Sequence, residues 1–250
     1  MNDKKINKIL TLLLKTGQML LESGAETYRA EETVVYLFNS ITFGEIDVFA
    51  IPTAINIDIV INDIHYSGIK SVRRRDINLE VIEKINTFSR YAVKNGIDVD
   101  TAFEALALIE NEKKGKTLFM IFSFGMAAGF FSLMLGGGFV EFVIAFLSCM
   151  LVQFMGKITK ISERVIFFHA VIGGALPAIL AKVFFNIFHF GDVNIIVIAS
   201  MLPLFPGIST VNAIRDAVWG DLVSGISRLL YAAITAVALA LGAAAIFAVM

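Results

Sequence analysis

Two prolines and a glycine interrupt an apolar run near the end of this 250-residue chain. The segment reads MLPLFPGISTVNAIRDAVWGDLVSG and holds Pro203, Pro206 and Gly207. Proline has no backbone N–H, so the carbonyls near Ala199 and Leu202 are expected to lose their helical partners. Gly207 is expected to let the backbone turn. The predicted result is two half-helices, one ending in free carbonyls and the next beginning with free N–H groups.

Two such helix ends could hold a zwitterion. Its carboxylate would lie at the N–H end and its ammonium at the carbonyl end, and the hydroxyls of Ser209 and Thr210 could add contacts. The predicted substrate-binding residues are therefore Pro203, Pro206, Gly207, Ser209 and Thr210. The alternative is a proline kink that only shapes packing.

Charged residues follow the break. Arg215 and Asp216 lie about two turns beyond Gly207, roughly 12 Å along a helix, where they could form an interfacial pair or an inner gate. Asp221 is expected to cap the next helix, which contains Arg228. Ionisable groups inside a membrane are functional candidates by default. The candidate gate or coupling residues are Arg215, Asp216, Asp221, Arg228, Glu141 and His169.

Composition places these residues in a membrane protein. Apolar side chains make up 57% of the chain and the mean hydropathy is +0.76. Residues 1–116 hold 15 Lys/Arg and 17 Asp/Glu, whereas residues 117–250 hold only 6 and 5. We therefore expect a soluble domain over 1–116 and a transmembrane domain over 117–250. The net charge of −1 gives no electrostatic footprint for nucleic acid.

A spanning helix needs about 20 mostly apolar residues. The predicted fold is an all-α membrane bundle of five transmembrane helices, the fourth broken at Pro203 and Pro206-Gly207, preceded by a small cytoplasmic α+β domain. The predicted spans cover about 117–135, 139–155, 165–187, 193–211 and 226–249. Glycine and alanine recur in them, as close helix packing in lipid favours.

The loops between these spans predict the orientation. Lys and Arg occur before the first span, between the second and third, and between the fourth and fifth, but not in the alternate loops. The positive-inside rule then makes the N-terminal domain cytoplasmic and places the C-terminus outside a multi-pass inner-membrane protein. The N-terminus does not resemble a signal peptide. An odd number of spans suggests one repeat of a transporter that pairs with a second subunit, and a homo-oligomer is also possible.

The N-terminal domain combines helices with a meander of strands. Helix periodicity covers 3–40 with a junction at Ser23-Gly24, and alternating isoleucines in TAINIDIVIND indicate a half-buried strand. EIDVFAI and IHYSGIKSV supply neighbouring strands, with a turn at Asn62-Asp63. Helices are predicted over 77–95 and 101–114, capped by Asp76 and by Thr101.

Signatures of enzymes and cofactors are missing from the sequence. It contains no HExxH, GxSxG, Walker A or strand-linked GxGxxG motif. His65, His169 and His189 lack metal-ligand spacing, and the single Cys149 cannot form an internal disulfide. We therefore expect neither an enzyme nor a resident metal or cofactor.

Two stretches resemble the threonine/serine exporter family. The first is GQMLLESGAETYRAEETV near the N-terminus, and the second is MLPLFPGISTVNAIRDAVWGDLVSGISRL. The resemblance covers nearly the whole chain and adds Asn212 to the substrate-binding candidates. The residues that match the family pattern are Gly17, Ser23, Gly24, Tyr28, Arg29, Glu31, Pro206, Gly207, Asn212, Arg215, Asp216, Gly220, Asp221, Gly225 and Arg228.

The resemblance implies a membrane exporter of small polar metabolites with threonine and serine as family substrates. Some split members are linked instead to dicarboxylates such as succinate. The family pattern continues into a second, shorter membrane unit, which this chain lacks, so the resemblance also implies a smaller partner subunit. Without a nucleotide-binding motif, a proton gradient is the expected drive. A scaffold or regulatory subunit that does not transport is the alternative from another class.

The cytoplasmic motif consists of Ser23, Gly24, Tyr28, Arg29 and Glu31. Glu26, Arg29 and Glu32 have the spacing of surface ion pairs on a helix. The alternative is that Arg29 and Glu31 dock the domain against Arg215 and Asp216.

Overall fold

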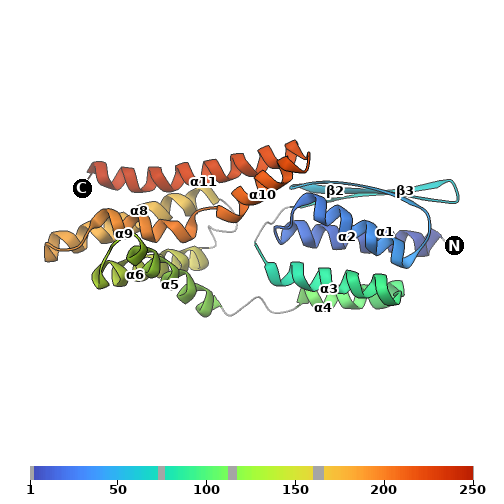
Figure 1. Ribbon diagram of the computed structural model, residues 1–250, viewed down its shortest axis with the longest axis horizontal. Helices are drawn as coiled ribbons and strands as arrows, with labels where there is room; N and C mark the ends of the chain where they lie inside the picture. Colours follow the sequence, from blue (N-terminus) through green and yellow to red (C-terminus); the bar gives the residue numbers. More distant parts are fainter. Residues whose placement is uncertain (1–2, 73–76, 112–116, 160–165, 250) are drawn as a thin grey trace. The chain divides into compact units, whose positions relative to one another are not determined.

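The computed structural model describes residues 3–72, 77–111, 117–159 and 166–249, and most of them are helical (Figure 1). The chain forms two compact units. The first unit consists of Met1–Lys113 together with Ser209–Leu229, and the second of Lys114–Ile208 together with Leu230–Met250. The first unit thus includes a late segment of the chain beside its N-terminal part.

A three-stranded antiparallel sheet lies in the first unit. Its order is β1 (Glu45–Ile51), β2 (Ala54–Ile61), β3 (Ile64–Ser71). The alternating isoleucines of β2 are buried on one face, as their period of two predicts. Asn62 and Asp63 have φ angles of 52° and 61°, so the predicted turn between β2 and β3 is confirmed.

Four helices complete the N-terminal part of this unit. Helices α1 (Asp3–Glu22) and α2 (Thr27–Ile41) cover one face of the sheet. Helices α3 (Leu79–Asn95) and α4 (Val99–Asn111) form a further layer against α1 and α2 (Figure 1). The core lies between the layers and is built on fully buried side chains, among them Phe38, Ile9, Leu13, Leu37 and Ile57.

Two predicted helix starts need correction. Helix α3 is capped by Asn78, whose side chain accepts a hydrogen bond from the Val81 N–H at 3.3 Å, while Asp76 lies outside the described residues. Helix α4 begins at Val99, so Thr101 is inside the helix and does not cap it. The Asp98 carboxylate accepts from the Asp100 N–H at 3.1 Å, which satisfies the first turn earlier than the predicted capping box would.

The second unit is a helical bundle. It holds α5 (Thr117–Met134), α6 (Phe139–Thr159), α8 (Ile166–Phe188), α9 (Val193–Met201) and the 3₁₀ turn η1 (Leu202–Leu204). Helix α10 (Gly207–Val218) follows, and the last helix is α11 (Leu222–Val249). Among the described residues, four helices are long and apolar enough to cross a membrane, or five if the bent pair of α9–η1 and α10 is one span. The predicted break at Pro203 and Pro206 is present between α9 and α10, and the last helix begins at Leu222 instead of 226.

Small residues sit at the contacts between these helices, as predicted. A Cβ added to Gly129 of α5 would lie 2.7 Å from the ring of Phe142 on α6. A Cβ at Gly174 of α8 would lie 1.9 Å from the Leu239 carbonyl oxygen of α11. One at Gly242 would lie 2.0 Å from the Val171 carbonyl oxygen. Glycine therefore lets these backbones touch.

Candidate functional site

The turn between α1 and α2 presents backbone carbonyls to side chains from the end of the chain. Gly24 has a φ of +85°, a conformation that glycine adopts without strain. Its carbonyl accepts a hydrogen bond from the Asn212 side-chain amide at 3.1 Å. The next carbonyl, of Ala25, accepts from the Arg228 guanidinium at 2.7 Å. Carbonyls that a helix end leaves unpaired are thus satisfied by α10 and α11.

Two carboxylates meet the hydroxyl of Thr27, the first residue of α2. Thr27 Oγ1 lies 3.2 Å from Asp216 Oδ1 and 2.8 Å from Asp221 Oδ2. Because a hydroxyl has one proton, it donates to one carboxylate at a time. Asp221 also accepts from the Ser224 N–H at 3.0 Å and so caps α11, as predicted. Burial would raise the pKa of Asp221, but the hydrogen bonds from Ser224 and Thr27 outweigh it and keep that pKa below its usual value.

Three arginines balance the three carboxylates around this turn. Arg228 Nε lies 2.8 Å from Asp216 Oδ2, and the Asp216 side chain is completely buried. Arg215 Nη1 lies 2.7 Å from Glu26 Oε1, and Arg29 Nε lies 3.4 Å from Glu26 Oε2. A buried carboxylate is tolerated when it is paired and hydrogen-bonded. We call Gly24–Arg29, Asn212, Arg215, Asp216, Asp221 and Arg228 the motif junction.

An aromatic stack joins Tyr28 of the junction to Trp219. The rings of Tyr28 and Trp219 are stacked with centroids 5.1 Å apart and an interplanar angle of 22°. The Arg29 guanidinium lies 6.0 Å from the centre of the Tyr28 ring. Such an arrangement adds a cation–π attraction to the ion pair of Arg29 with Glu26.

The structure thus brings both quoted motifs together within the first unit. Docking runs through Glu26 and Thr27, which sequence reasoning did not select as partners of the second motif. Arg29 contacts Glu26 and Tyr28 instead of Asp216, so the predicted helical ion pair is present. Glu31 accepts a hydrogen bond from the Ala50 N–H at 2.7 Å, and its burial raises its pKa, as do the charges of Asp221 and Asp47. Ser23 is buried, and its carbonyl accepts from the Asn78 N–H at 3.0 Å.

The break after α9 is made by residues 202–206. The Phe205 N–H bonds to the Leu202 carbonyl at 3.1 Å and the Gly207 N–H to the Phe205 carbonyl at 2.8 Å, and the helices on either side are bent by 52°. The Leu202 carbonyl therefore keeps a partner, contrary to expectation. The φ of Gly207 is not positive and an added Cβ would meet nothing within 4 Å, so the turn does not depend on glycine there.

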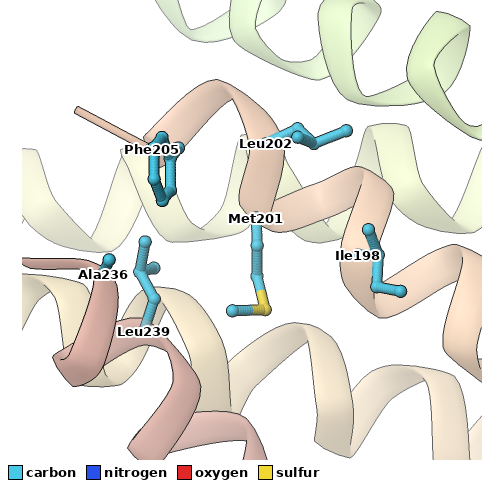
Figure 2. A pocket seen from close by; sticks show the side chains of 6 residues that line it. All are labelled: Ile198, Met201, Leu202, Phe205, Ala236 and Leu239. Atoms are coloured by element: carbon cyan, nitrogen blue, oxygen red, sulfur yellow. The ribbon is translucent and has the colours of Figure 1, made fainter. Parts of the chain in front are cut away.

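An apolar pocket of about 200 Å³ lies beside this break within the second unit. Figure 2 shows the side chains that line it: Ile198, Met201, Leu202, Phe205, Ala236 and Leu239. None of them is polar. The pocket walls therefore offer only apolar contacts, and polar contacts at the break would have to come from backbone groups.

Two further candidates have local roles in the second unit. Glu141 accepts hydrogen bonds from the Gly138 N–H at 2.7 Å and the Asp192 N–H at 2.9 Å, so it ties together two loops. His169 presses its ring against α6, where a Cβ on Gly156 would lie 2.6 Å from Nε2. That nitrogen is buried and lacks a hydrogen-bond partner among the described residues.

Ser209 and Thr210 lie half-buried on α10. Among the described residues, no group of three or more His, Cys, Asp or Glu could hold a metal ion.

Comparison with known proteins agrees with the two motifs. The family described as "Putative threonine/serine exporter" matches residues 11–250. The "Probable threonine/serine exporter" of Mycobacterium tuberculosis (strain ATCC 25618 / H37Rv) is 22% identical over 244 residues, which cover 91% of this chain and 44% of that protein. The chain thus spans less than half the length of this relative. No solved structure matches the chain significantly. Because the family match covers nearly every residue, the chain belongs to the threonine/serine exporter family.

Proposed function

We propose that the chain is a subunit of a secondary-active exporter of small polar metabolites in the inner membrane, with threonine and serine as its first candidate substrates. Family membership supports the substrate class, and the apolar helices of the second unit support the location. A dicarboxylate such as succinate is the second candidate, because one helix end can hold one carboxylate without an ammonium partner.

The broken helix carries this proposal. In hydrocarbon, an unpaired backbone group costs several kcal/mol by order of magnitude, so such breaks persist where they line a cavity or lie against protein. A scaffold that only assembles with partners has no need of one. Here the break adjoins an apolar pocket. Backbone dipoles act more strongly on a charged substrate in such surroundings.

The direction of the helices supports five crossings with a cytoplasmic N-terminus. Helices α8 and α11 pack side by side in the same direction, since Gly174 meets Leu239 and Lys182 reaches the Phe247 carbonyl further along both helices. The chain between them must therefore return across the bundle, and α9 with η1 begins that return. The Lys and Arg residues before α5, between α6 and α8 and on α10 then lie on the cytoplasmic side.

A second, smaller membrane subunit would complete the transporter. Exporters made of two related halves place the substrate site where the halves meet. Association with this subunit, or with another copy of the chain, is part of the proposal.

Of the coupling candidates Glu141, Asp216 and His169, His169 is the strongest candidate for a proton carrier. Glu141 already accepts two backbone hydrogen bonds, and Asp216 is paired with Arg228. His169 Nε2 is buried without a partner among the described residues, so a proton or a moving partner could occupy it. Replacing His169 with Gln should then abolish the dependence of export on the proton gradient, whereas Glu141→Gln should lower the amount of folded protein.

The test is efflux from cells preloaded with labelled threonine or labelled succinate. The chain would be expressed alone and then with a small membrane subunit of the same family. Threonine efflux that needs both proteins would support the two-subunit amino-acid exporter. Succinate efflux would keep the architecture and change the substrate. No efflux of either compound, with both proteins in the membrane, would favour the scaffold.

A further inference from the structure

The hairpin formed by α10 and the first turns of α11 has two different faces. Its inner face, with Asn212, Asp216 and Arg228, is used by the motif junction. Its outer face exposes six large apolar side chains, namely Val211, Ile214, Val218, Leu222, Val223 and Ile226. Positions 211, 214 and 218 follow the helical spacing of three and four residues, so they form one stripe on α10. We call these six residues the outer face.

Amphipathic aromatic and basic side chains border this face. Trp219 stands at the tip of the hairpin and is 68% exposed, although its ring is stacked on Tyr28. Arg29 and Arg215 are each 54% exposed beyond their contacts with Glu26. Trp and Tyr beside basic residues are typical of the layer where lipid headgroups meet hydrocarbon.

The length of α11 points to the same layer. The helix has 28 residues and so extends about 42 Å at 1.5 Å per residue, whereas about 20 residues suffice to cross the hydrocarbon. About two turns are therefore surplus to a crossing, and we assign them to the first turns of the helix, next to its only charged residue, Arg228. They carry Leu222, Val223 and Ile226, and the exposed apolar surface continues along the same helix through Leu230 and Ile234.

We propose that the outer face rests in the headgroup layer of the cytoplasmic leaflet, with Trp219 and Tyr28 at the interface and with Arg29 and Arg215 against lipid phosphates. The proposal rests on the proposed membrane orientation. A bilayer fits better than a protein partner because Leu222, Val223 and Ile226 belong to a helix that is long and apolar enough to cross a membrane. The inner face, which holds the α1–α2 turn, then faces away from the lipid.

Trp219 allows a direct test because it is the only tryptophan in the chain. The full chain would be reconstituted in vesicles of phosphatidylcholine and phosphatidylglycerol with lipids brominated either near the headgroup or deep in the acyl chain. We expect the shallow bromines to quench Trp219 emission at least twofold more than the deep ones. Iodide present on both sides of the vesicles should quench only weakly.

Two results would overturn the proposal. Quenching by iodide but not by either lipid would place Trp219 in water, and quenching by neither would place it under protein. Both can be told apart from failure of the proposed function. A chain that exports with an unquenched Trp219 contradicts only this inference, and a quenched Trp219 without export contradicts only the exporter.

A second quenching experiment tests the proposed contact of Arg29 and Arg215 with lipid phosphates. Brominated phosphatidylglycerol should quench Trp219 about threefold more than equally brominated phosphatidylcholine, because the anionic lipid gathers at Arg29 and Arg215. Arg29→Gln should lower this ratio toward one, and Arg29→Lys should restore most of it. Arg90→Gln, which removes an exposed arginine from α3, is the matched control and should leave the ratio unchanged. A ratio that Arg29→Gln does not alter would refute the phosphate contact.

Discussion

Asp216 and Arg228 form the most deeply buried ion pair among the described residues, with Nε and Oδ2 2.8 Å apart. Removing one partner leaves the other charge buried, which typically costs about 3–5 kcal/mol. We expect Asp216→Ala to lower the thermal unfolding midpoint by about 6–20 °C, at roughly 2–4 °C per kcal/mol for a chain of this size. Trp219 emission, followed in detergent as the temperature rises, would measure this midpoint.

Two variants control that measurement. Asp216→Leu combined with Arg228→Met removes both charges at similar volume and should recover at least half of the loss. Arg90→Ala, at an exposed position, should stay within about 0.5 kcal/mol of the parent. A double variant as unstable as Asp216→Ala would show that the pair is not what holds the junction.

The raised pKa of Glu31 predicts that the stability of the fold depends on pH. Its pKa is raised in the folded chain, chiefly by burial, so the folded state prefers the protonated carboxyl. Stability contributed by this group is therefore present below the unfolded pKa of about 4.3 and is lost as the pH rises through the folded pKa. Glu31→Gln keeps an oxygen for the Ala50 N–H and removes the charge. It should raise the unfolding midpoint at pH 7 by about 1–3 °C and leave it unchanged at pH 4; a lower midpoint at pH 7 would contradict this account.

Single residues were only partly predictable. Arg215, Asp216, Asp221 and Arg228 were selected from their place beyond the break, and Asp221 caps a helix as expected. Their partners were not foreseen, because Thr27 is 189 residues from Asp216 and no periodicity links such positions. The one available signal was the presence of charged and hydroxyl residues in both motifs, which leaves the pairing open.

At the scale of elements, close packing of α8 against α11 gives a sharp prediction. A Cβ at Gly174 would lie 1.9 Å from the Leu239 carbonyl oxygen, so the two backbones must move apart. Gly174→Ala should cost about 1–3 kcal/mol and reduce the yield of folded protein. Gly207→Ala is the matched control, since a Cβ there meets nothing within 4 Å and should not affect yield. Equal yields of the two variants would argue against this helix contact.

Element types followed well from the pattern of residues, whereas their ends did not. The isoleucine alternation predicted β2, and the apolar runs predicted the long helices of the bundle. The helix starts near 78 and 98 were misplaced because Asn78 and Asp98 offered better caps than the residues chosen. The break was foreseen from its prolines, but its pocket was not, since α11 contributes two of the lining side chains.

At the scale of the whole molecule, the segment Ser209–Leu229 belongs to the first compact unit. A fragment of residues 1–116 would expose the carbonyls of Gly24 and Ala25 and leave Glu26 without Arg215. We expect this fragment to unfold at a lower temperature than the same fragment with residues 207–229 joined through a flexible linker. Circular dichroism melts would compare them, and identical melts would show that the motif junction adds no stability. No single boundary in the sequence describes a unit that contains two separate segments of the chain.

The central claim is that export passes the break between α9 and α10. The most direct test is efflux of labelled threonine by Gly207→Leu, with the partner subunit present. Because the position has open space and an ordinary φ, the variant should reach the membrane in normal amounts. The account predicts that efflux falls at least tenfold, while Ala244→Leu, at an exposed helical position of α11 that does not line the pocket, keeps efflux in proportion to its amount in the membrane. Normal efflux by Gly207→Leu would contradict the claim.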